Sequence, residues 1–316
     1  MLDAPAVQRR VRELAGTTGP LSCVVAWSGG LDSTVLLHAL LAGRRGGIAL
    51  RAVHVDHGLQ PAAVAFRAFC EHSARDWQLP LTVLRVKVRV PRGASPEEAA
   101  RHARRAALAS ALQPKELLLT AQHQDDQLET LLLALLRGAG PKGLAGMPAS
   151  MPIGGTRLLR PLLDFDRAAI AAYAHQARLE WVEDPTNAEG RFDRNYLRAR
   201  VLPALRERWP AVARTAARSA RHCAVAAAVL EQGARRDLDA AADGAGLEVT
   251  VLRRFTPARR AAVLRAWILR AGARAPNERH LRQIEAMMAA RPDAHPLLRL
   301  PDCSVRREGM RLTIAT

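Results

Sequence analysis

A short polar stretch between two apolar runs contains the residue types that bind phosphate. It follows the apolar run 21–27 and consists of Ser28, Gly29, Gly30, Leu31, Asp32 and Ser33. Glycines have no Cβ and let an anion approach the backbone, and a helix that begins there offers free N–H groups. The serine hydroxyls add further donors. The stretch therefore predicts a phosphate-binding turn between a strand and a helix.

A second interpretation of the same turn needs no ligand. An ordinary strand-to-helix turn, with Ser33 or Asp32 as the N-cap residue, would fit these residues as well. The turn also lacks the Gly-Lys-Ser/Thr of a Walker A motif, so it is not the loop of that class of nucleotide-binding protein. The two interpretations differ in whether a side chain caps the helix.

Acidic residues cluster at the start of another helical stretch, 123–137. Asp126 and Glu129 are three residues apart on one helical face, and Asp125 lies one turn before Glu129. Capping of the helix N-terminus, which stabilises a helix by ~0.3–1 kcal/mol, would explain Asp125 and Asp126 better than Glu129. The functional alternative is a carboxylate pair that faces the phosphate-binding turn and holds Mg²⁺ or a cationic substrate.

A third polar segment, His54-Val55-Asp56-His57-Gly58-Leu59, ends an apolar run. Its histidines and aspartate have the chemistry of metal ligands. The alternation of side chains along a strand would place His54 and His57 on opposite faces, however, which argues against a shared metal ion.

Strands and helices alternate in the first half of the chain and would bring these segments together. Such alternation predicts a doubly wound parallel sheet, whose ligands lie at the carboxyl ends of the strands. The strand that follows Pro80 alternates apolar and basic residues, which predicts a place near the sheet edge. Strands are expected at 21–27, 48–55, 80–88 and 116–120, and helices at 33–42, 62–78, 95–112 and 123–137.

The pattern changes after Gly138. A Gly- and Pro-rich loop spans 138–155, and a long helical stretch spans 204–242 with an interruption near Trp209. The last residues read as a smaller domain that is α+β or mostly α. We expect three parts: a catalytic domain over 1–205, a helical linker over 206–246 and the small domain over 247–316.

The composition favours a globular protein with a polyanionic partner. Of 316 residues, 49% are hydrophobic, which allows a sizeable core. Lys and Arg outnumber Asp and Glu by 47 to 30, and the formal charge of +17 favours nucleic acid as the partner. The four cysteines are scattered without a C-x-x-C pair, so neither disulfides nor a zinc site is expected. We find no membrane span and no secretion signal, and expect a cytoplasmic protein.

The turn at Ser28 resembles the SGGxDS signature of the PP-loop ATP pyrophosphatases, with an adenine nucleotide alpha hydrolase-like fold. Further segments narrow the resemblance to the tRNA(Ile)-lysidine synthase family. Gln60 stands where that family usually has Arg, and Arg105 stands where it has Tyr. The segments are HVDHGL at 54–59, EEAARHARR at 97–105, the acidic helix with LRGAGPKGLAGM up to Met147, RPLL at 160–163, and DPTN at 184–187 with RNYLR at 194–198.

The resemblance implies a ligase that uses ATP, with Mg²⁺ as a cofactor. Such an enzyme adenylates C2 of the wobble cytidine in a tRNA(Ile) with a CAU anticodon. It then joins the ε-amine of L-lysine to C2, giving lysidine, AMP and pyrophosphate. ATP would be bound by the residues Ser28–Ser33 and by His54 and Asp56 of the segment that lines the nucleotide pocket.

The resemblance also suggests roles for charged residues elsewhere. We hypothesise that Asp126 and Glu129 bind the ammonium group of lysine and Arg101 its carboxylate, while Asp32 orders Mg²⁺ or takes the proton. Which acid serves lysine and which serves Mg²⁺ stays open. The residues expected to contact the tRNA are Arg104, Arg160, Arg194, Asn195 and Arg198. For Arg101 and Arg104 the alternative is a solvated basic helix face.

Two other functions remain open on the sequence. One is a PP-loop tRNA thiolase, which would normally need paired cysteines, and the other is a non-catalytic RNA-binding protein on the same fold. The oligomeric state is open too, a homodimer included. Some relatives have a further C-terminal domain, for which this chain is too short, so we expect either a short form or a shortened chain.

Overall fold

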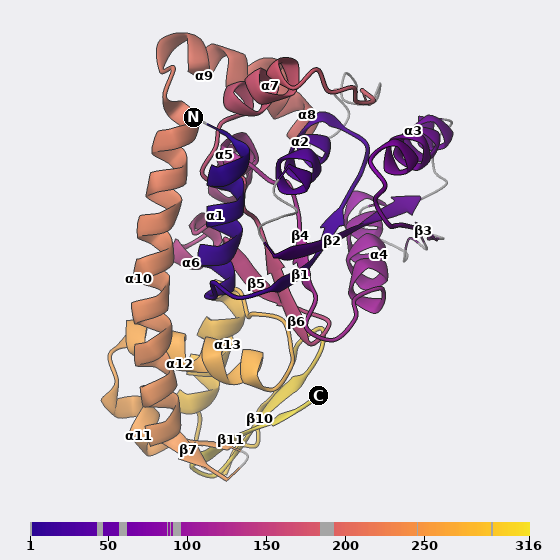
Figure 1. Cartoon of the computed structure of the whole chain (residues 1–316). Coiled ribbons are helices and arrows are strands. Elements are labelled where there is room, and N and C mark those ends of the chain that lie inside the picture. The colour runs from indigo at the N-terminus through magenta and orange to yellow at the C-terminus, as the bar shows by residue number, and fades with distance from the viewer. Residues whose placement is uncertain are drawn as a thin grey trace. The chain divides into compact units, whose positions relative to one another are not determined.

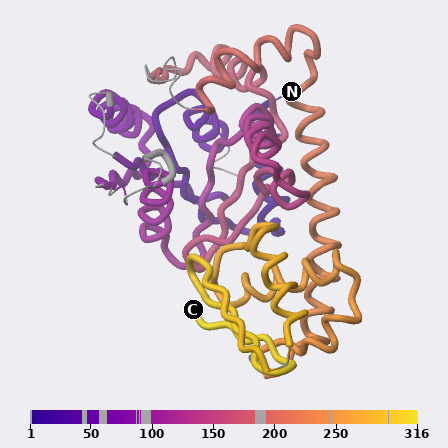
Figure 2. The backbone as a smooth tube through the Cα atoms, turned by 180° about the vertical axis from the view of Figure 1, so that it is seen from behind, coloured from indigo at the N-terminus to yellow at the C-terminus, as the bar shows by residue number. Residues whose placement is uncertain are grey.

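The computed structural model describes residues 2–42, 47–56, 62–86, 88, 90, 96–183, 193–244, 246–291 and 293–316. The chain divides into two compact units, Met1–His222 and Cys223–Thr316. Each unit has its own sheet, with six strands in the first and five in the second (Figures 1 and 2). The boundary falls inside one long helix, α10 (Val212–Ala241). A separate helical linker over 206–246 remains a prediction.

The sheet of the N-terminal unit is parallel except for one edge strand. Its strands are β1 (Leu21–Ala26), β2 (Ile48–Asp56), β3 (Leu81–Arg85), β4 (Leu117–Leu119), β5 (Ser150–Ile153) and β6 (Thr156–Leu159). The strand order is β3-β2-β1-β4-β6-β5, with β5 antiparallel to β6. β3 lies at an edge of the sheet, as predicted, although it ends at Arg85 and not at the expected Val88. The carboxyl ends of β1, β2 and β4 therefore meet at one side of the sheet.

Helices cover both faces of this sheet. The helices in the described part of this unit are α1 (Ala4–Ala15), α2 (Leu31–Leu41), α3 (Ala62–Asp76), α4 (Pro96–Ser110), α5 (Gln124–Leu136), α6 (Pro141–Leu144), α7 (Arg167–Gln176), α8 (Asp193–Tyr196) and α9 (Leu202–Arg208). Cys23 and Val25 pack with α1, α2, α3 and α7, whereas Val24 and Ala26 pack with Leu108 of α4 (Figure 1). The prediction of a doubly wound parallel sheet is confirmed.

Two segments differ from the structure that the sequence pattern predicted. The stretch 138–155, expected to be a loop, contains α6 and the edge strand β5. Between α8 and α9 lies one turn of π-helix, η3 (Leu197–Val201). Turns of π-helix are rare and often occur at functional sites. The expected interruption near Trp209 is confirmed, because α9 ends at Arg208 and α10 begins at Val212.

The C-terminal unit packs the second part of α10 and three further helices of the described chain with an antiparallel sheet. Its elements are β7 (Ala242–Asp243), β8 (Gly246–Glu248), α11 (Val249–Arg254), α12 (Pro257–Arg270), α13 (Glu278–Ala289), β9 (Leu297–Arg299), β10 (Ser304–Glu308) and β11 (Arg311–Ala315). The strand order is β7-β8-β11-β10-β9. Leu264, Ile284 and Val305 are fully buried in its core. Of the two alternatives for a smaller second domain, the α+β one is correct.

A buried arginine completes the end of α13. Arg307 has no exposed surface, and its guanidinium donates to the carbonyl oxygens of Met287, Met288 and Ala290 at 2.8, 2.9 and 2.7 Å. A helix leaves its last carbonyls without N–H partners, and its C-terminus favours positive charge. Arg307 meets both requirements and ties β10 to α13.

An internal ion pair joins strand β2 to the residue before β4. Arg51 Nε and Nη2 donate to the two carboxylate oxygens of Glu116 at 2.7 and 2.5 Å. Gln113 N also donates to Glu116 Oε2 at 2.7 Å. The Glu116 side chain is only 6% exposed. The hydrogen bond from Arg51 outweighs burial and lowers the pKa of Glu116 below its ordinary value.

We expect Glu116→Gln to destabilise the protein by ~3–5 kcal/mol, because it leaves the Arg51 guanidinium without a carboxylate. Since the folded pKa of Glu116 is lowered, its contribution is present above the ordinary value of 4.5 and is lost as the pH falls through the folded pKa. Urea unfolding at pH 7 and at pH values below 4.5 tests both statements.

The matched control is Asp239→Asn, which removes an exposed carboxylate paired with Arg270 at 3.1 Å. We expect it to change stability by about 0.5 kcal/mol or less. Equal effects of Glu116→Gln and Asp239→Asn would contradict a structural role for the buried pair.

Candidate active site

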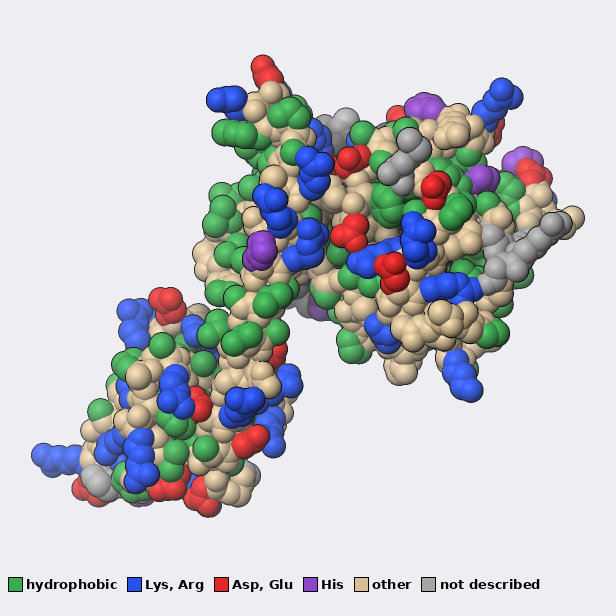
Figure 3. Space-filling view, turned by 60° about the vertical axis from the view of Figure 1, so that its left-hand side comes forward, with side chains coloured by type: hydrophobic (Ala, Val, Ile, Leu, Met, Phe, Trp, Pro, Cys, Tyr) green, Lys and Arg blue, Asp and Glu red, His purple; other side chains and the backbone are tan. Residues whose placement is uncertain are grey.

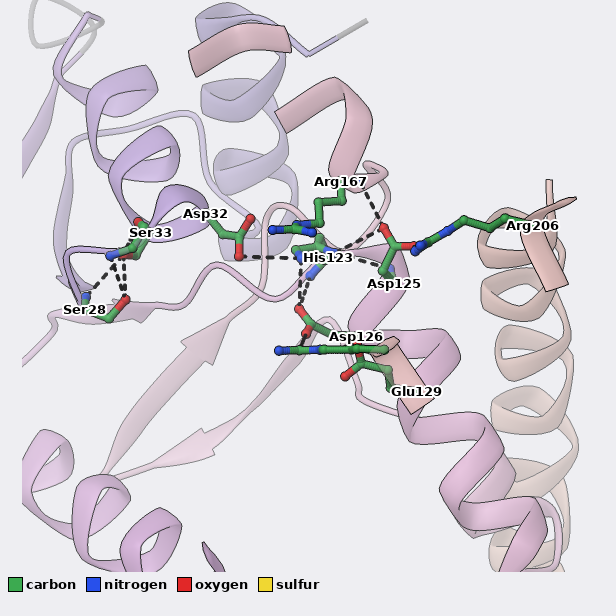
Figure 4. Close-up of polar contacts among 11 residues, drawn as sticks. Ser28, Asp32, Ser33, His123, Asp125, Asp126, Glu129, Arg167 and Arg206 are labelled. Atoms are coloured by element: carbon green, nitrogen blue, oxygen red, sulfur yellow. Dashed lines mark hydrogen bonds and ion pairs between the residues drawn. The ribbon is translucent and has the colours of Figure 1, made fainter. Parts of the chain in front are cut away.

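The side chains of two serines form hydrogen bonds within the turn between β1 and α2 (Figure 4). Ser28 Oγ and Ser33 Oγ lie 2.9 Å apart, and Ser33 Oγ donates to Gly30 O at 3.1 Å. Gly29 has φ +89°, a conformation that favours glycine. Gly30 is the N-cap residue of α2, and no side chain caps this helix. The alternative of a turn capped by Ser33 or Asp32 is therefore wrong, and the helix end suits an anion.

A histidine joins this turn to the acids of α5. His123 is 4% exposed and is the N-cap residue of α5. Its Nε2 lies 3.6 Å from Asp32 Oδ2 and 3.5 Å from Asp126 Oδ2 (Figure 4). Burial alone would lower the pKa of His123, but the hydrogen bond to Asp32 and the nearby carboxylates outweigh it and raise that pKa. The phosphate turn and the acidic helix thus meet at one place.

An arginine reaches the same acids from the exposed side. Arg198, in the π-turn η3, donates from Nε to Glu129 Oε1 at 2.5 Å and from Nη2 to Asp126 Oδ1 at 3.0 Å. The Glu129 side chain is 2% exposed and that of Arg198 is 41% exposed. Burial raises the pKa of Glu129 despite the hydrogen bond from Arg198. The π-turn therefore places a cation where the sequence predicts that lysine binds.

Two carboxylate oxygens in this cluster have no partner among the described residues. They are Asp32 Oδ1 and Glu129 Oε2, and both are buried. A buried carboxylate oxygen without a donor costs free energy, which a bound cation or N–H group would recover. The donor set therefore fits a cationic ligand, and Asp32 fits Mg²⁺, which often binds one or two carboxylates together with phosphates.

Asp125 has a different environment from its neighbour. Its Oδ2 accepts from Arg167 N, at the start of α7, at 3.0 Å, and its Oδ1 accepts from Arg206 of α9 (Figure 4). Burial would raise the pKa of Asp125, but these hydrogen bonds lower it. Asp125 thus ties three helices together, beyond the helix capping predicted from its position.

The end of β2 lies beside the end of β1. His54 Nδ1 donates to Trp27 O at 2.9 Å, and burial lowers the pKa of His54. Asp56 forms an ion pair with Arg67 at 3.2 Å. Both residues are buried at the carboxyl end of β2, beside the carboxyl end of β1 where the phosphate turn begins. His57 and Gln60 lie outside the described residues.

The predicted arginine sites differ in exposure. Arg160 is 8% exposed and donates to Pro148 O at 2.6 Å and to Gln122 Oε1 at 3.2 Å. Burial lowers its pKa to about 10. Arg101 lies exposed on α4, and no described contact joins it to the acids of α5. The charge of Arg104, also on α4, acts on His54.

The remaining predicted residues lie near the π-turn or outside the described residues. Arg194 and Asn195 are half-buried in α8, and the charge of Arg194 acts on Glu129. Asp184 to Asn187 lie outside the described residues. His123 and Arg206 were not predicted from the sequence as site residues. The place of His123 directly before the acids was the only local signal for it.

Two family models match the chain. Residues 4–205 match a PP-loop domain, and residues 247–313 match the substrate-binding domain called TilS. The solved U34-tRNA thiolase NcsA from Methanococcus maripaludis is similar in fold. It has a TM-score of 0.55 at 15% identity, covering 69% of this chain and 77% of that one. At this identity the likeness concerns the fold alone.

Curated relatives are much more similar in sequence. The tRNA(Ile)-lysidine synthase of Alkalilimnicola ehrlichii is 49% identical over 93% of this chain and 67% of its own length. That of Pseudomonas aeruginosa is 44% identical over 99% of this chain and 73% of its own length. That of Methylococcus capsulatus is 46% identical over 91% of this chain and 67% of its own length.

The parallel sheet, the uncapped turn at Gly30 and the PP-loop match define an ATP-binding protein of the PP-loop class. Within that class the chain belongs to the tRNA(Ile)-lysidine synthase family. It is accordingly a tRNA-modifying enzyme and a ligase.

We expect Gly29→Ala to weaken ATP binding by roughly tenfold or more, from backbone strain of about 1–3 kcal/mol. The added Cβ would also lie 3.2 Å from Cys70 Sγ and from a ring carbon of Phe66. The control is Gly233→Ala in α10, where nothing lies within 4 Å. Titration with ATP should separate the two variants, and unchanged binding in Gly29→Ala would contradict the phosphate-loop assignment.

Proposed function

We propose that the turn at Ser28 and the acids around His123 form lysidine in one site. ATP would adenylate the C2 oxygen of the wobble cytidine in a tRNA(Ile) with a CAU anticodon. The ε-amine of L-lysine would then attack C2, and AMP would leave. The supporting observation is that Asp32 of the turn and Asp126 of α5 both approach His123 Nε2, at 3.6 and 3.5 Å.

The turn would hold the pyrophosphate that leaves during adenylation. The N-terminal N–H groups of α2 have no side-chain cap, and Ser28 and Ser33 supply hydroxyls beside them. Asp32 Oδ1, buried without a partner among the described residues, is the ligand we assign to Mg²⁺. Bound there, Mg²⁺ would neutralise charge on the phosphates. His54 and Asp56 would line the nucleotide pocket at the neighbouring strand end.

The acids of α5 would bind the amino group of the substrate lysine. Glu129 Oε2 is buried and has no partner among the described residues, and Asp126 Oδ1 accepts a hydrogen bond from the exposed Arg198. The ε-amine has a reference pKa of ~10.4, so it must lose a proton before it attacks C2. As the new C2–N bond forms, the bond from C2 to the adenylated oxygen breaks. Asp32 is the proposed proton acceptor if it does not bind Mg²⁺, and Arg101 the proposed partner of the lysine carboxylate.

Basic side chains near the site would contact the tRNA. Arg194, Asn195 and Arg198 belong to the short helical turns next to Glu129, and Arg104 lies near His54. Lys and Arg side chains are spread over the face shown in Figure 3, in line with the charge of +17. Arg160 was also predicted to contact RNA, but its internal hydrogen bonds suggest that it supports the loop at Pro148 instead.

A thiolase is the less supported alternative. Burial raises the pKa of both Cys23 and Cys70 to about 12, so neither thiol ionises readily. No described cysteine forms a disulfide. We also propose a cytoplasmic location for the protein. No helix in the described parts of the chain is long and apolar enough to cross a membrane.

We expect Asp126→Asn and Glu129→Gln each to weaken lysine binding by roughly 10–100-fold, because each removes a charged partner of the ammonium group. Lysine titration measures this directly. ATP–pyrophosphate exchange with tRNA but without lysine reports adenylation separately and should change less.

The control variant is Asp193→Asn, which alters an exposed carboxylate of α8 that lies 3.8 Å from Arg137. It should leave lysine affinity unchanged. If Asp126→Asn keeps the wild-type lysine affinity, the assignment of the acids is wrong.

Mass spectrometry of the tRNA product tests the reaction itself. We expect the mass of one lysine to be added with loss of water, and AMP to form only when tRNA and lysine are both present. Exchange of oxygen for sulfur would support the thiolase instead.

A further inference from the structure

The two ring nitrogens of His123 have different partners. Asp125 N donates to Nδ1 at 3.2 Å, while His123 N donates to Asp126 Oδ2 at 3.0 Å, which completes a capping box. Because Nδ1 accepts the hydrogen bond from Asp125 N, the ring carries a hydrogen on Nε2. This hydrogen faces Asp32 Oδ2 and Asp126 Oδ2, which are 3.6 and 3.5 Å from Nε2. Asp125 Oδ2 also lies 3.6 Å from Nδ1.

The contacts of His123 leave one oxygen of each acid for other groups. Asp32 directs Oδ2 to the ring, and its Oδ1 is buried without a partner among the described residues. Asp126 directs Oδ2 to the ring and to the backbone N–H of His123. The other oxygen of Asp126, Oδ1, faces Arg198. A group that fixes one carboxylate oxygen in this way orients the other toward a ligand.

We propose that His123 is a positioning residue that holds Asp32 of the phosphate turn and Asp126 of the lysine site in one arrangement. The proposal rests on the proposed function, because it assigns Asp32 to the adenylation half and Asp126 to the lysine half of the reaction. The Nε2 atom of His123 lies between two carboxylates that would otherwise repel each other, 3.6 Å from Asp32 Oδ2 and 3.5 Å from Asp126 Oδ2. His123 therefore couples the position of the nucleotide to the position of the attacking amine.

His123 also has a structural role as N-cap residue, and two variants separate the roles. In His123→Asn the side-chain oxygen can take the place of Nδ1 and cap α5, but the side chain is too short to reach both acids. In His123→Gln the amide N–H₂ extends to about the place of Nε2, while the N-cap bond is lost.

We expect His123→Asn to keep a melting temperature close to the wild type, to raise the KM for lysine about tenfold or more, and to slow tRNA-dependent ATP–pyrophosphate exchange. We expect His123→Gln to melt lower but to recover most of the lysine KM and the exchange rate per folded molecule. His123→Ala should lose both the N-cap bond and the contact with the two acids, so we expect it to melt lower and to show the raised lysine KM and the slowed exchange. A purely structural role would change the melting temperature without this separation.

The proposal is overturned if His123→Asn keeps the wild-type KM and exchange rate, or if His123→Gln is no better than His123→Ala in both. Asp126→Asn distinguishes this failure from failure of the proposed function. If Asp126→Asn weakens lysine binding and His123→Asn does not, only the positioning role is wrong. If Asp126→Asn has no effect on lysine, the proposed function fails and the positioning role with it.

Discussion

The gathering of several partly or fully buried carboxylates in one place is the constraint on which the rest of this site depends. Asp126 and Glu129 belong to one helix, and Asp32 approaches them from another. Like charges in a site of low dielectric constant repel and are costly to ionise. The protein offsets this cost with His123 between two of the acids and Arg198 against two of them. The same arrangement leaves oxygens that a cationic substrate can use.

The parallel sheet makes this arrangement possible. Because β1 and β4 run side by side in the same direction, the turn after β1 and the turn before α5 come to the same edge. Helices bury β1 on both faces. The phosphate turn therefore directly follows a strand of the unit's core.

Arg198 links the acids to the part of the chain that follows the sheet. It lies in a π-turn, where the extra residue per turn changes the direction of the side chains. Arg206, one helix later, binds Asp125 on the same α5. Two arginines of neighbouring helical segments thus meet three acids of one helix, which ties η3 and α9 to α5.

Local patterns were enough to predict much of this protein. Alternation of strands and helices predicted the doubly wound sheet, and the alternating third strand predicted its place at an edge. The spacing of Asp126 and Glu129 placed both on one helical face, since helical periodicity is a local property. Gly29 and Gly30 indicated a turn open to an anion for the same reason, because a missing Cβ acts on the backbone beside it.

Contacts between distant residues were decided only by the tertiary structure. Nothing local to His123 indicates Asp32 as its partner, and nothing local to Arg198 indicates that it reaches Glu129. Arg160 is a further example. Its sequence context predicted a cation that contacts RNA, but the fold buries its side chain. Helical and strand periods determine which face a side chain is on, whereas strand order and helix packing determine what that face meets.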